Sequence, residues 1–117
     1  MEEALFRTML FDSYGELLTE KQREYFDLHY NEDLSLAEIA QSEGVSRKSV
    51  WDIIRRAEET MRRFEEKTGL VARFAAERDI LAAAREKLAR LETMTDGDAQ
   101  RLAREIAAAL QELGHGI

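Results

Sequence analysis

A glycine between two helix-start signals is the feature that most constrains how this chain can fold. Ser35 can cap a helix, and Glu38, three positions later, can reach back to complete a capping box. Ser46 can cap a second helix. Gly44 lies between them and can adopt the left-handed conformation that ends one helix and turns the chain. A short capped helix, a tight glycine turn and a second capped helix predict a helix-turn-helix.

The apolar spacing supports this prediction. Ile39, Val45 and Val50 are expected to face inward, and Ala40 is small where two helices must cross closely. At 100° per residue, the second helix has one apolar side, formed by Val50, Ile53, Ile54, Ala57, Met61 and Phe64. The opposite side carries mixed charges, with Lys48, Asp52, Arg55 and Glu59 near its centre.

The rest of the chain also reads as helix. It contains no proline, which favours long uninterrupted helices. Apolar periodicity and caps predict further helices over residues 2–17, 20–31, 70–93 and from about 95 to 113, and Leu17 is placed on the apolar stripe of the first of these. We therefore expect an all-α fold with a helix-turn-helix domain at 1–68 and a C-terminal helical extension at 69–117. The extension is expected to pack on the domain or on a second subunit, so a homodimer stays open.

The charge distribution localises any nucleic-acid contact to one helix. The net charge of −7 is unusual for a nucleic-acid-binding domain. Residues 46–63, however, hold six Lys/Arg against three Asp/Glu. In a helix-turn-helix, the N-terminal part of the second helix enters the major groove of DNA. The predicted nucleic-acid-binding residues are therefore Arg47, Lys48, Ser49, Trp51, Arg55 and Arg56. The alternative for this surface is a solvated helix face without a ligand.

Trp51 has two interpretations. It lies at the flank of the charged side, where it could stack on an unpaired base, as aromatic side chains do in RNA recognition. The interpretation favoured by the sequence is that it fills a seam against a neighbouring helix.

Several classes of function lack support. There is no cysteine, and the two histidines lie far apart, so neither a metal site nor a cofactor is expected. No glycine-rich phosphate loop or nucleophile motif is present, and we expect a binding protein, not an enzyme. The acidic N-terminus does not resemble a signal peptide, and no segment is apolar enough for membrane insertion. A cytoplasmic location is therefore expected.

The N-terminal part of the chain resembles known proteins. Residues 18–67 are similar to region 4 of bacterial sigma factors. With the helix that precedes them, residues 5–70 resemble the YlxM family of small bacterial proteins. The most specific stretches are LLTEKQREYFDLHY, SLAEIA and GVSRKSVWDIIRRAE. The alanine-rich tail after Gly69 follows the family less closely.

The resemblance implies an accessory or regulatory role in the signal recognition particle pathway. Its implied partners are the particle RNA and the particle GTPase, and members are also described as DNA-binding. The residues that carry over are those of the motif: Arg47, Lys48, Ser49, Arg55 and Arg56. Two alternatives remain open: a transcription regulator that reads duplex DNA, and a protein-interaction adaptor that binds no nucleic acid.

Overall fold

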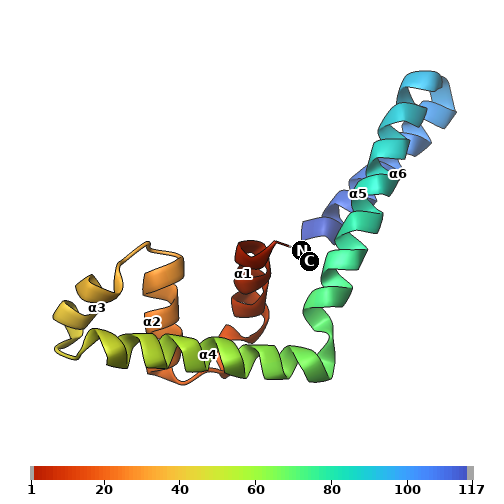
Figure 1. Cartoon of the computed structure of the whole chain (residues 1–117). Coiled ribbons are helices and arrows are strands. Elements are labelled where there is room, and N and C mark those ends of the chain that lie inside the picture. The colour runs from red at the N-terminus through yellow and green to blue at the C-terminus, as the bar shows by residue number, and fades with distance from the viewer. Residues whose placement is uncertain (1, 116–117) are drawn as a thin grey trace. The chain divides into compact units, whose positions relative to one another are not determined.

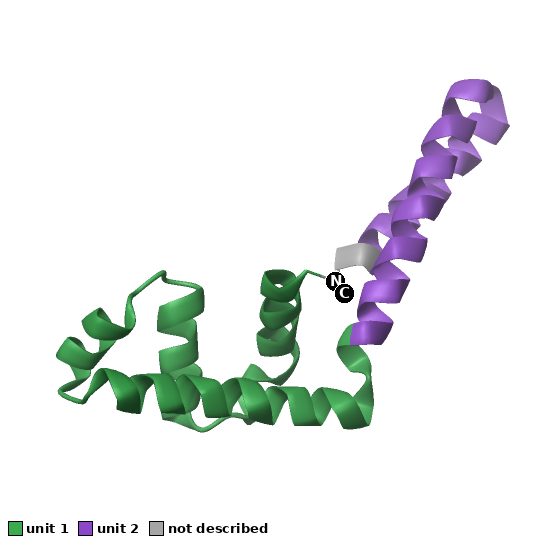
Figure 2. Ribbon diagram, in the orientation of Figure 1, with its two compact units in different colours: residues 1–71 green, residues 72–117 purple. Residues whose placement is uncertain are grey.

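The computed structural model describes residues 2–115. They form helices joined by short turns, with no strand in this range, which confirms the all-α prediction (Figure 1). The elements are α1 (Glu3–Tyr14), the short 3-10 helix η1 (Gly15–Leu17), α2 (Glu20–Tyr30), α3 (Leu36–Glu43), α4 (Arg47–Thr68), α5 (Leu70–Met94) and α6 (Gly97–His115). The chain divides into two compact units after Val71 (Figure 2). Unit 1 comprises residues 1–71 and unit 2 residues 72–117.

The helix starts are set by local hydrogen bonds, as the sequence predicts. Thr19 and Ser35 both form complete capping boxes at the starts of α2 and α3. The Ser46 hydroxyl accepts a hydrogen bond from the Ser49 backbone N–H at 3.0 Å and so caps α4. Gly44 ends α3 with φ +69°, in the left-handed region that an L side chain rarely adopts. These contacts build the predicted helix-turn-helix from α3 and α4.

The core of unit 1 lies along one side of α4. Figure 1 shows α1 and α2 side by side across α4, and the rings of Phe11 and Phe26 stack between them at 5.0 Å. Ala40 of α3 is 6% exposed, as expected for a close helix crossing. The α4 side chains that are fully buried in this core are Val50, Ile54, Ala57 and Met61. Ile53 and Phe64 pack against the same cluster.

Two apolar residues lie outside the core, against the sequence analysis. Val45 was expected to face inward, but it is 39% exposed. The turn after Gly44 leads the chain into α4 with Val45 at the surface. Leu17 was placed on the stripe of the first helix, but it is 63% exposed. The first helix ends at Tyr14, and the tighter η1 turn rotates Leu17 outward while Leu18 becomes buried.

Unit 2 is a helical hairpin of α5 and α6 (Figure 2). The turn between them contains Gly97 at φ +59°. The guanidinium of Arg104 donates to Glu92 at 2.6 Å, and that of Arg85 donates to Gln111 at 2.8 Å. These pairs show that the two helices run in opposite directions. Ala103 is 2% exposed between them, so small side chains allow the helices to approach closely.

Candidate nucleic-acid interface

The first turn of α4 presents its side chains to solvent. Arg47, Lys48 and Ser49 follow the Ser46 cap, and all three are exposed. The Ser49 hydroxyl lies 3.0 Å from that of Ser46, so Ser49 has a capping role in addition to any contact with a ligand. Because the buried side of α4 is held by α1, α2 and α3, the charged side faces outward. The predicted surface is therefore accessible.

Trp51 is exposed, contrary to the interpretation favoured by the sequence. It is 41% exposed and does not belong to the core cluster or to the residues packed against it. Trp51 lies about 100° around the helix from Val50, outside the arc that the neighbouring helices cover. Part of the Trp51 side chain is therefore accessible to solvent.

Ion pairing sorts the cations of α4 into two groups. Arg55 donates to Glu59 at 2.7 Å and lies 3.9 Å from Asp52. Arg47, Lys48 and Arg56 form no ion pair or hydrogen bond through their side chains within residues 2–115. Of the predicted cations, these three therefore carry uncompensated positive charge, while that of Arg55 is partly neutralised.

Arg62 has a structural role, because its side chain pairs with carboxylates of the same chain. Its Nε donates to Glu58 at 3.1 Å, and its guanidinium also pairs with Glu3 of α1. Arg7 of α1 donates to the other oxygen of Glu58 at 2.7 Å and stacks over the Tyr30 ring at 4.4 Å. This network ties α1 to α4, so Arg62 is not a free phosphate ligand.

The same network shifts the ionisation of its members. Partial burial would raise the pKa of Glu58, but hydrogen bonds from Arg7 and Arg62 outweigh it and lower that pKa below its usual value. The hydrogen bond to Glu58 raises the pKa of Arg7. Both groups stay charged at neutral pH, which keeps α1 fixed against α4.

The basic surface continues further along α4 than predicted. Arg63 lies two turns beyond Arg56 on the same flank, and Lys67 one turn beyond Arg63. Both are exposed, and neither forms an ion pair within the described part of the chain. Arg63 donates only a long hydrogen bond of 3.4 Å to Thr60. The seven-residue spacing from Arg56 is the sequence signal that identifies this extension. We call Arg47, Lys48, Arg56, Arg63 and Lys67 the basic surface of α4.

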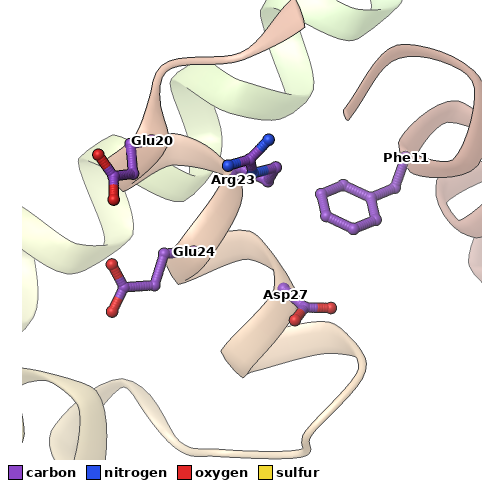
Figure 3. A pocket seen from close by; sticks show the side chains of 5 residues that line it. All are labelled: Phe11, Glu20, Arg23, Glu24 and Asp27. Atoms are coloured by element: carbon purple, nitrogen blue, oxygen red, sulfur yellow. The ribbon is translucent and has the colours of Figure 1, made fainter. Parts of the chain in front are cut away.

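The hollow beside α2 has the opposite character. Figure 3 shows a pocket lined by Phe11, Glu20, Arg23, Glu24 and Asp27. Its one cation, Arg23, pairs with Glu16 at 3.1 Å. The nearby Glu43 of α3 raises the pKa of Glu24 by charge repulsion. An acidic hollow of this kind repels phosphate.

Other kinds of site find little support in the described residues. No group of three or more His, Cys, Asp or Glu side chains within residues 2–115 is placed to hold a metal ion. The His29 ring is engaged with the Leu34 carbonyl oxygen at 2.8 Å. None of the helices in the described range is both long and apolar enough to cross a membrane.

Comparison with known proteins identifies relatives of this chain. Residues 1–100 match the sequence profile of UPF0122, described as "Putative helix-turn-helix protein, YlxM / p13 like". A UPF0122 protein of Halalkalibacterium halodurans is 39% identical over 113 residues, which cover 97% of this chain and 95% of the relative. A UPF0122 protein of Thermoanaerobacter sp. (strain X514) is 50% identical over 72 residues, which cover 62% of each chain. The matches to the Thermoanaerobacter relatives thus span about three-fifths of their length.

Proposed function

We propose that this chain, which belongs to the YlxM/p13-like family of helix-turn-helix proteins (UPF0122), binds nucleic acid through the basic surface of α4. The observation that carries the proposal is the set of exposed cations without intramolecular partners, of which Arg47, Lys48 and Arg56 lie nearest the start of the helix. Each can neutralise a phosphate without breaking an existing ion pair. A family of helix-turn-helix proteins also favours a binding role over catalysis.

Within this proposal, RNA is the favoured ligand. Trp51 is exposed beside Lys48 at the start of α4, where an indole can stack on a splayed base. The first helices are acidic, and the pocket of Figure 3 would repel the flanking phosphates of a long duplex. The resemblance to the YlxM family points to the signal recognition particle RNA, and an accessory role in that pathway is part of the proposal.

Duplex DNA is the second candidate. The first turn of α4 is exposed at the position where a recognition helix enters the major groove. A carboxylate such as Asp52 can accept a hydrogen bond from cytosine. This function would make the chain a transcription regulator.

The test is fluorescence anisotropy of the full chain with labelled signal recognition particle RNA, random duplex RNA and random duplex DNA at one stated salt concentration. We expect tightest binding to the particle RNA. Selective binding to duplex DNA would favour the regulator instead. Equally weak binding to all three would contradict the nucleic-acid proposal and favour a protein-interaction adaptor, with the particle GTPase as the first partner to assay.

Two sets of variants locate the interface. Lys48→Glu combined with Arg56→Glu should abolish binding, while Arg78→Glu, an exposed charge reversal on α5, should change it far less. Trp51→Ala should weaken RNA binding more than Trp51→Phe, because phenylalanine retains a stacking ring. Equal losses for the two Trp51 variants would argue against stacking.

A further inference from the structure

The basic surface of α4 divides into two parts. Arg47 and Lys48 lie in the first turn, four and three residues before Trp51, so both are neighbours of this exposed side chain on the helix surface. Three further cations follow along the helix: Arg56, Arg63 and Lys67. At 100° and 1.5 Å per residue, these three fall within an arc of about 40° and extend over about 16 Å. We call them the distal row.

The distal row and Trp51 lie on opposite flanks of the solvent-facing side of α4. On the helical wheel, the centre of the row is about 140° from Trp51. A line of carboxylates runs between the two flanks: Asp52, Glu59 and Glu66. Asp52 and Glu59 lie close to Arg55, on the Trp51 side of this line, whereas Arg63 donates to Thr60 on the other side. No side chain of the distal row forms an ion pair within residues 2–115.

Beyond the first turn, the unpaired cations of α4 therefore lie on one flank only. On the Trp51 flank, Arg55 pairs with Glu59. Arg62, on the same flank, pairs with Glu58 and Glu3. A helix within a major groove has a phosphate backbone on each side of it. The distal row can neutralise only one backbone, so α4 is suited to lie along a single phosphate strand.

The distal row suits a strand whose bases are already paired. Proteins that bind single strands combine cations with aromatic side chains on which successive bases stack. Phe64 is the only aromatic residue of α4 after Trp51, and it packs against the core of unit 1. The distal row therefore offers no surface for stacking, and a stem needs none, because its bases stack on one another. Trp51 is 41% exposed and suits an unpaired base.

We propose, on the basis of the proposed function, that α4 recognises RNA at the junction between a base-paired stem and an unpaired segment. The distal row contacts phosphates of one strand of the stem. The first turn of α4 holds the unpaired segment, and Trp51 stacks on one of its bases. About 18 Å of helix separates Trp51 from Arg63, so the two contacts fall on different parts of the ligand.

Three related RNAs test this specificity. They are a blunt duplex, the same duplex with an unpaired extension on one strand, and the longer strand alone. Fluorescence anisotropy with the full chain at one salt concentration should show tightest binding to the extended duplex. Equal binding to the two duplexes, or tightest binding to the single strand, would overturn the junction proposal and leave nucleic-acid binding intact. A lack of binding to all three would instead contradict RNA binding itself.

Variants assign the two contacts. Trp51→Ala should weaken binding to the extended duplex by roughly 5- to 150-fold, the range for one lost base stack, and should leave binding to the blunt duplex nearly unchanged. Arg63→Glu should weaken binding to both duplexes and reduce the salt dependence of both. Lys21→Glu makes the same change in net charge at an exposed position of α2 and should weaken binding less. An equal loss on both duplexes for Trp51→Ala would contradict the assignment of Trp51 to the unpaired segment.

Discussion

Arg55 donates a hydrogen bond to Glu59 at 2.7 Å, while the adjacent Arg56 has no such partner within the described residues. Two neighbouring arginines of α4 therefore differ in the charge that they can offer. We expect Arg56→Ala to weaken nucleic-acid binding and to reduce the slope of log K against log salt by about 0.7–0.9, the value for one lost phosphate contact. Arg55→Ala should have a smaller effect. Anisotropy titrations at several salt concentrations measure both.

Glu59, the carboxylate that pairs with Arg55, provides the complementary control. Glu59→Gln should strengthen binding, because it removes a negative charge and frees the Arg55 guanidinium. If Arg55→Ala proved as damaging as Arg56→Ala, ion pairing would not determine which arginine contacts the ligand.

Ala40 fixes how closely α3 approaches α4. It is 6% exposed, so a larger side chain has no space without moving a helix. We expect Ala40→Leu to lower the free energy of unfolding by about 1–3 kcal/mol through overpacking. Ala37→Leu, on the exposed side of the same helix, is the matched control. Urea denaturation of both variants gives the comparison, and equal stabilities would mean that Ala40 does not lie at the crossing.

The Arg7–Glu58 pair should make stability depend on pH in the acid range. The pKa of Glu58 is lowered in the folded state, so its contribution is fully present above its unfolded pKa, near 4.5, and is lost as pH falls through the folded value. Glu58→Gln should cost about 1–3 kcal/mol at neutral pH, since two arginines lose a charged partner. The loss of stability caused by Glu58→Gln should become smaller as the pH falls.

Thermal melts of Glu58→Gln between neutral pH and pH 3 follow this change. Glu59→Gln, which breaks the exposed pair with Arg55, should cost less than about 1 kcal/mol. A deficit for Glu58→Gln that stayed constant with pH would show that the carboxylate charge is not responsible.

Glu24 and Glu43 repel each other across α2 and α3. The pKa of Glu24 is raised mainly by the charge of Glu43, so the pair destabilises the fold once both groups ionise, as pH rises through that raised value. Glu43→Gln should therefore raise the melting temperature at neutral pH. Glu32→Gln makes the same change in net charge at an exposed turn position, and it should raise the melting temperature less. The advantage of Glu43→Gln should disappear well below pH 4.5; its persistence there would exclude charge repulsion as the cause.

The sequence predicts features that depend on a few neighbouring residues. The starts of α2, α3 and α4 follow from capping residues within four positions. The buried side of α4 follows from the helical spacing of its apolar residues. Features that depend on distant residues were missed. The network of Arg62 with Glu3 of α1 joins positions far apart in the chain, and its members look like ordinary surface charges in the sequence.

Exposure at the edge of an apolar pattern is also hard to predict. Trp51 lies at the border of the buried arc of α4, and only the positions of the neighbouring helices decide that it stays exposed. Within α4, the pairing of Arg55 with Glu59 follows the four-residue spacing, and the unpaired state of Arg56 becomes evident only when surrounding carboxylates are placed.

The first turn of α5 has a consequence for how the chain can be divided experimentally. Val71 is fully buried in the core of unit 1, and its backbone N–H donates to Glu65 at 2.9 Å, the same carboxylate that accepts from the Tyr14 hydroxyl at 2.6 Å. A truncation after residue 68, where the α4 helix ends, would remove a core side chain and a donor to Glu65. The smallest fragment that retains the packing of the helix-turn-helix must therefore include Val71, and homologous tails can be exchanged only downstream of it.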